Sequence, residues 1–158
     1  MQLTSYSVIP LVVLLAYLLP LTIVLGDRRA GAPHLLFVYL VASATWAFTS
    51  FMVYANYFPG QLALWGGLLP LTGLWAVVAY CHLICAFTRR HVVTWTVLGY
   101  TFLAGLAVLA ALGYIPQSLQ YVRGTQVGIY YGPWLYLMII GGAWFSGLSV
   151  FYLVQRYR

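Results

Sequence analysis

The chain has 158 residues, of which 64% are hydrophobic and only 5% are charged. Soluble domains carry about a quarter charged residues, so this composition predicts an integral membrane protein. The formal charge of +6 comes from seven basic residues, all of them arginines, against one acidic residue, Asp27. A rhodopsin-type Schiff base needs a lysine, and a proton pump normally needs carboxylates within the membrane, so both classes are excluded. Nucleic-acid binding is not expected, because the arginines lie at helix ends rather than in one patch.

The first uncharged run, residues 8–26, predicts a membrane-spanning helix that contains Pro10 and Pro20. It lacks the positive amino-terminal region, the short apolar core and the small-residue cleavage site of a signal peptide, so we expect it to be retained. A second span is predicted over residues 35–56. Small residues in this span would let neighbouring helices approach closely in lipid. They are Ala42, Ser43, Ala44, Ala47 and Ser50.

The third run, residues 62–87, carries no charge and is followed by Arg89, Arg90 and His91. A run of this length can span a bilayer with some tilt. In hydrocarbon its backbone must satisfy its own hydrogen bonds, which predicts a helix. The arginine pair marks its cytoplasmic end, because cationic loops stay on the side of synthesis.

A fourth span is predicted over residues 92–113 and a fifth over residues 133–154. Between them, alternating residues on both sides of Gly124 predict a hairpin. Six of the seven arginines then lie inside and only Arg123 lies outside, which predicts an amino terminus outside and a carboxyl terminus inside. The predicted fold is therefore a single all-α domain, an integral membrane bundle of five transmembrane helices with a small external β-hairpin between the fourth and fifth.

Three tryptophans are predicted to lie near the middle of the membrane: Trp46, Trp75 and Trp144. They either pack against glycines of neighbouring helices or line a pocket. An aromatic-lined pocket would suit an apolar ligand, a lipid or a quinone, because such sites are concave and mostly apolar.

His82 is the only histidine predicted to lie within the membrane, and Tyr80 is one conceivable partner for it. It is either a hydrogen-bonded packing residue or a sensing or proton-linked group, because histidine titrates near neutral pH. Haem b needs two histidines at similar depth on facing helices. His34 and His91 are predicted near the inner surface, so a haem held by His34 and His82 is a further alternative.

Cys81 and Cys85 lie four residues apart on the third predicted helix. A disulfide within one helical turn has poor geometry. A metal site formed with His82 would lack a fourth ligand, so no metal is expected. We interpret the cysteines as small apolar residues. No nucleophile–base pair or carboxylate pair is visible in the sequence, so an enzyme is not expected.

The segment Val78–Leu83, which contains Tyr80 and His82, resembles the Tyr-x-His stretch in the N-terminal seven-helix region of bacterial histidine kinases. The segment Tyr39–Ser43 with Trp46, and the exit Leu112–Tyr114 with its external hairpin, resemble the same region. The resemblance covers the first five of the seven helices of that family.

This resemblance implies a non-catalytic sensor for signal transduction in the bacterial cytoplasmic (inner) membrane, in contact with membrane lipids and acting through another membrane protein chain. The alternative is a small accessory subunit of a larger bioenergetic complex that packs lipid, quinone or pigment. A third hypothesis is a haem-binding redox protein.

Overall fold

The computed structural model describes residues 5–26, 34–56, 58–88, 92–115, 118–122 and 126–157. These residues form five α-helices: α1 (Ser5–Gly26), α2 (His34–Ala55), α3 (Leu62–Thr88), α4 (Val92–Ala111) and α5 (Trp134–Tyr157). All five are long and apolar enough to cross a membrane. The prediction of a multi-pass membrane protein built as a helical bundle is therefore confirmed. The arginine pairs, Arg123 and His91 lie outside the described residues.

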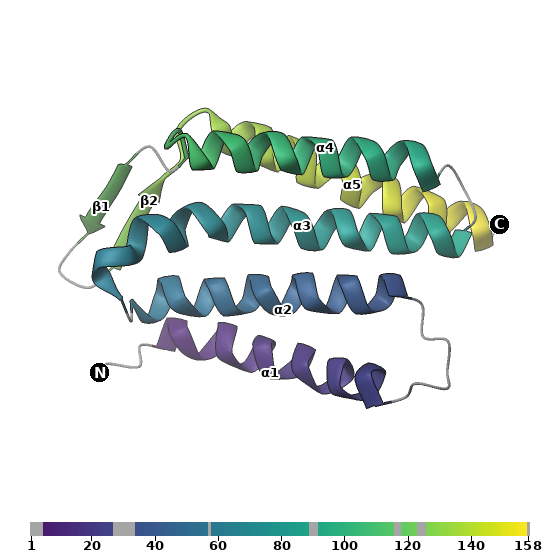
Figure 1. Ribbon diagram of the computed structural model, residues 1–158, viewed down its shortest axis with the longest axis horizontal. Helices are drawn as coiled ribbons and strands as arrows, with labels where there is room; N and C mark the ends of the chain where they lie inside the picture. Colours follow the sequence, from purple (N-terminus) through teal and green to yellow (C-terminus); the bar gives the residue numbers. More distant parts are fainter. Residues whose placement is uncertain are drawn as a thin grey trace.

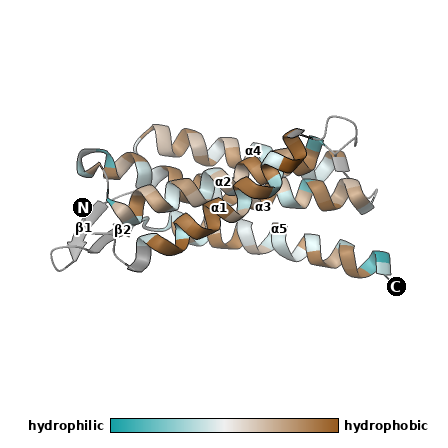
Figure 2. Ribbon diagram, turned by 90° about the horizontal axis from the view of Figure 1, so that it is seen from below, coloured by the Kyte–Doolittle hydropathy of each residue, from teal (hydrophilic) through white to brown (hydrophobic). Residues whose placement is uncertain are grey.

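Helix α3 is the central helix of the bundle (Figure 1). α2 packs along one side of it, α4 and α5 pack along the other, and α1 packs against α2. Figure 2 shows hydrophobic residues along most of the length of the helices and hydrophilic residues at the carboxyl end of α5. This pattern is expected for helices whose outer faces lie against lipid rather than water.

The two ends of the bundle differ in their connections. At the end that we call the arginine end, α1, α3 and α5 finish and α2 and α4 begin. Six of the seven arginines adjoin these helix ends in the sequence. The other end, which carries strands β1 (Ser118–Val122) and β2 (Gln126–Tyr130), is called the strand end.

Small residues bring α2 and α3 close together. Ala42 of α2 and Ala76 and Ala79 of α3 form one buried cluster. Such residues let helix backbones approach in lipid, where apolar packing alone provides little drive for association. The small residues predicted to pack on α2 are all buried: Ala42, Ser43, Ala44, Ala47 and Ser50.

Glycines perform the same role where α3, α4 and α5 converge. A Cβ added to Gly99 of α4 would lie 2.7 Å from Val78 of α3 and 3.3 Å from Phe145 of α5. A Cβ added to Gly141 of α5 would lie 2.5 Å from the ring of Phe102 of α4. No side chain fits at either position without a shift of its neighbours.

Polar contacts join the helices near the arginine end. The guanidinium of Arg156, in the last turn of α5, donates a hydrogen bond to the carbonyl of Phe87 in the last turn of α3. The same guanidinium lies 3.9 Å from the centre of the Phe87 ring. A cation there also suits the negative end of the helix dipole of α3. Between α4 and α5, Trp95 Nε1 donates to the Tyr152 hydroxyl at 2.8 Å.

Helix α4 ends at Ala111, two residues before the end of the predicted span. Gly113 has a φ of +81°, a conformation that glycine adopts without strain. The Gly113 and Tyr114 amides donate to the carbonyls of Ala110 and Leu109, both at 3.0 Å. This is the Schellman pattern that terminates helices, so the helix stops while the apolar sequence continues.

Strands β1 and β2 pair in antiparallel register, with Ser118 opposite Tyr130 and Val122 opposite Gln126. The predicted turn between them, residues 123–125, lies outside the described residues. Ile129 of β2 lies against Gly66 of α3, where an added Cβ would be 3.1 Å from Ile129 Cδ1. This contact packs β2 against the part of α3 nearest the strand end.

Candidate functional site

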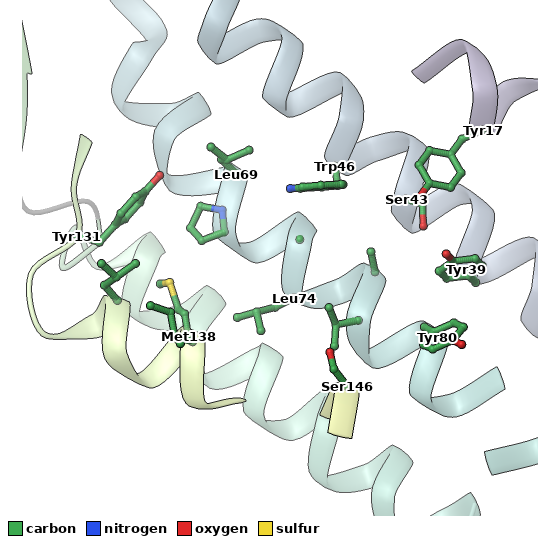
Figure 3. A pocket seen from close by; sticks show the side chains of 16 residues that line it. Tyr17, Tyr39, Ser43, Trp46, Leu69, Leu74, Tyr80, Tyr131, Met138 and Ser146 are labelled. Atoms are coloured by element: carbon green, nitrogen blue, oxygen red, sulfur yellow. The ribbon is translucent and has the colours of Figure 1, made fainter. Parts of the chain in front are cut away.

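An elongated groove runs along α3 between α2 and α5 (Figure 3). Its volume is about 570 Å³, which falls within the range of about 300–1,000 Å³ found for small-molecule sites. α3 lines it from Leu69 to Tyr80, a distance of roughly 16 Å at the helical rise per residue. Tyr17 of α1 and Tyr131, which follows β2, also line the groove.

Most of the groove is apolar. Leu74 contributes to its floor, and Leu135, Met138 and Ile139 of α5 contribute to one wall. None of the residues that line the groove carries a formal charge. The arrangement therefore suits a neutral, largely apolar ligand that enters from the lipid, whereas a charged group placed here would have no counter-charge.

The indole of Trp46 lies across α3 at Gly73. A Cβ added to Gly73 would be 3.1 Å from Trp46 Nε1 and 3.2 Å from Cδ1. The absence of a side chain at residue 73 lets the ring rest close to the α3 backbone, and a Cβ there would require the ring to shift by a few tenths of an ångström. Trp46 forms part of the α2 wall, and it remains 39% exposed.

Hydroxyl groups gather in the part of the groove nearer the arginine end. The rings of Tyr39 and Tyr80 have centroids 5.5 Å apart and planes tilted by 50°. Tyr17 interacts with the hydroxyls of Tyr39 and Ser43. Figure 3 shows these four side chains, which we call the hydroxyl cluster, on three neighbouring helices. A hydroxyl can both donate and accept hydrogen bonds, so the cluster can hold a polar group of a ligand.

Tyr131 lies nearer the strand end and donates a hydrogen bond to a backbone carbonyl of α3. Pro70 has no N–H, so the carbonyl of Gly66, four residues earlier, has no helical hydrogen-bond donor. The Tyr131 hydroxyl donates to this carbonyl at 3.0 Å. Burial, and to a lesser extent the nearby Tyr54, raises the pKa of Tyr131 to about 12. The phenol therefore stays protonated and available as a donor at neutral pH.

The structure brings two of the five predicted pocket residues together. Trp46 and Tyr80 both line the groove. Trp75 packs instead against the alanine cluster between α2 and α3. Trp144 is 58% exposed on α5 and contacts Trp95, with ring centroids 6.2 Å apart. His82 is turned toward α4.

Tyr17 and Tyr39, which join Tyr80 in the hydroxyl cluster, were not among the predicted pocket residues. All three are tyrosines inside apolar runs and away from the predicted interfaces. A phenol in the hydrocarbon region needs a partner, so a search for tyrosines rather than tryptophans would have pointed to these residues.

His82 lies at the interface of α3 and α4. Its ring meets the ring of Tyr100 edge-on, with centroids 6.0 Å apart, and its Nδ1 is buried without a hydrogen-bond partner in the described part of the chain. His34 is the first residue of α2, on the opposite side of α3 (Figure 1). The two imidazoles therefore do not face each other across a shared space, and their placement does not fit a pair of axial haem ligands.

Cys81 and Cys85 are free and buried. They belong to a core cluster with Ile84 of the same helix and with Phe145 and Tyr152 of α5. Among the described residues, no group of three His, Cys, Asp or Glu side chains is placed to hold a metal ion.

No protein-family model matches the chain, and comparisons with curated proteins and with solved structures also give no match.

Proposed function

We propose that this chain is a non-catalytic sensor module of the bacterial cytoplasmic membrane, which binds an apolar ligand in the groove and acts through a partner chain. In this proposal the strand end lies outside, with the two strands as a small external hairpin, and the arginine end lies inside. The gathering of six arginines beside one set of helix ends supports this orientation. The resemblance of Tyr80, His82 and their neighbours to the histidine kinase sensor region supports the sensor class.

The observation that carries the proposal is the position of the groove between α2 and α5. Both helices pack against α3, and the groove separates them. A ligand in the groove contacts all three helices at once. If it binds one spacing of α2 and α5 more tightly than another, it shifts the population toward that spacing.

The arginine end offers a route from this spacing to a partner. α5 reaches it at Tyr157, and Arg156 connects the last turn of α5 to the last turn of α3. A change in the separation of α2 and α5 therefore alters the surface formed by these helix ends. A partner chain that contacts this surface would receive the signal.

A distance measurement in the presence and absence of ligand tests this proposal. Spin labels attached at His34→Cys and Tyr157→Cys would report the separation of α2 and α5 at the arginine end. Both positions are exposed, and the native cysteines are buried. Native lipid extract added to the protein in nanodiscs should shift the distance by about 1–2 Å or more, as expected for helix movements that carry signals.

A matched pair of variants on α5 completes the test. Ser146 is exposed and lines the groove, whereas Ala143 is exposed and lines a separate surface hollow. Ser146→Phe should fill the groove and abolish the distance change, and Ala143→Phe should leave it intact. A distance that does not respond to the extract, or that responds equally in both variants, would contradict the proposal.

A second candidate, an accessory subunit of a bioenergetic complex, is favoured by the hollow beside Trp144. The hollow measures about 310 Å³ and is formed by α5 alone, from Ala143 to Phe151. Small residues between aromatic ones make a surface into which a side chain of a neighbouring helix can pack. Purification from native membranes in a fixed ratio with cofactor-bearing chains, lost in Ala143→Phe, would support this candidate over the sensor.

A further inference from the structure

The polar part of the groove restricts the chemistry of its ligand. Four hydroxyl side chains form the hydroxyl cluster, and the lining residues provide no formal charge. Tyr39 and Tyr80 both line the groove, and each phenol can donate a hydrogen bond. A neutral oxygen acceptor suits such donors, and a charged head group is disfavoured because no counter-charge lines the groove.

The depth of the cluster argues against a phospholipid as the occupant. α3 has 27 residues, so it is about 40 Å long and exceeds the hydrocarbon core of about 30 Å by roughly 5 Å at each end. Tyr80 lies eight residues before the end of α3 at Thr88, about 12 Å along the helix and so roughly 7 Å inside the hydrocarbon. A phospholipid would have to draw its ester groups away from the interface to reach this depth.

The shape of the groove favours a ligand that has a flat ring attached to an aliphatic tail. The rings of Tyr39, Tyr80 and Trp46 surround the polar part, where a flat ring can stack or meet them edge-on. From there an apolar channel continues along α3 toward Leu69 and Pro70. An alkyl or isoprenoid chain can lie along this uncharged channel.

We propose that the occupant is a lipid-soluble quinone, bound with a ring carbonyl at the hydroxyl cluster and its tail along the apolar channel. This inference rests on the proposed function, because it names the ligand class of the same groove. The carbonyl accepts a hydrogen bond from Tyr39 or Tyr80, and the quinone moves from the lipid into the groove without leaving the hydrocarbon region. Binding requires no electron transfer.

Two probes that differ only in their carbonyls test the proposal. The first is a decyl-substituted dimethoxy-methyl-benzoquinone, and the second is a decyl arene with the same other substituents but no carbonyl. Both would be radiolabelled and measured by equilibrium binding to the full chain in phosphatidylcholine nanodiscs, with empty nanodiscs subtracted. The quinone should bind about 3- to 10-fold more tightly than the arene, the factor expected for one neutral hydrogen bond.

Variants of the groove tyrosines test where the quinone carbonyl binds. Tyr39→Phe and Tyr80→Phe together should weaken quinone binding to the level of the arene and leave arene binding unchanged. Tyr136→Phe is the control, because Tyr136 is a tyrosine of α5 that is 70% exposed and does not line the groove. Circular dichroism of each variant would verify that the helices are intact.

The outcomes separate this inference from the proposed function. If both probes bind equally and Ser146→Phe abolishes the binding of both, the groove is a ligand site but quinone recognition is wrong. If added anionic phospholipid displaces the quinone at equal concentration, the occupant is a lipid and the inference is also overturned. If Ser146→Phe changes the binding of neither probe, the groove is not the site and both proposals fail.

Discussion

The hydrogen bond from Tyr131 to the carbonyl of Gly66 gives the sharpest quantitative prediction. Pro70 removes the only helical donor that this carbonyl could have, so the phenol supplies a partner within an apolar bundle. Tyr131→Phe removes the bond and leaves the carbonyl unpaired. We expect the free energy of unfolding to fall by about 1–3 kcal/mol, the range measured when a buried polar group loses its partner.

A double-mutant cycle tests the cause of this loss. In Pro70→Ala the alanine N–H can donate to Gly66, so Tyr131→Phe should then cost less than about 0.5 kcal/mol. Unfolding by SDS in mixed micelles, followed by far-ultraviolet circular dichroism, provides the four free energies. Tyr130→Phe is the neighbouring control, because Tyr130 is 60% exposed. An equal loss in both backgrounds, or an equal loss from Tyr130→Phe, would refute the reasoning.

The same unfolding assay checks three further predictions. Gly99→Ala should destabilise the bundle by roughly 1–3 kcal/mol through overpacking. Gly105→Ala is the control and should be neutral or slightly stabilising, because a Cβ at Gly105 has no neighbour within 4 Å. Equal effects of the two substitutions would show that the stability of α4 packing does not depend on the close contact at Gly99. Arg156→Gln should lower the free energy of unfolding by about 1 kcal/mol, because it removes the contact with the Phe87 ring and the hydrogen bond to α3. Arg156→Lys should retain only part of this stabilisation. Full stability in Arg156→Lys would exclude a role for guanidinium geometry. Trp95→Phe and Tyr152→Phe should each cost about 1 kcal/mol or more. The double variant should cost less than the sum of the two, because both remove the same hydrogen bond; additive losses would contradict this.

The helices could be predicted from the sequence because hydrocarbon leaves an uncharged run few options. A run such as residues 62–87 must form a helix to satisfy its backbone, whatever its side chains contact. The residue at which α4 ends was harder to predict from the sequence. The sequence remains apolar to Gly113, but a local turn with positive φ stops the helix at Ala111.

The groove could be predicted only in part, because these helices are apolar on every face. In a soluble protein the polar face shows how a helix is rotated, and here that signal is absent. Trp46 and Trp75 were therefore indistinguishable in the sequence, although one lines the groove and the other packs between α2 and α3. The partnership of Tyr131 with Gly66 spans 65 residues and depends on the bundle being assembled.

The central position of α3 also has a consequence for biogenesis. α1 and α2 leave the ribosome before α3, and they pack against each other in the bundle. α3 emerges third, and α2, α4 and α5 all pack against it. Each helix that follows α1 thus packs against a helix synthesised before it, which allows the bundle to assemble in the order of synthesis. Once Thr88 has left the ribosomal exit tunnel, the α2–α3 alanine contact can form before α4 reaches the bilayer.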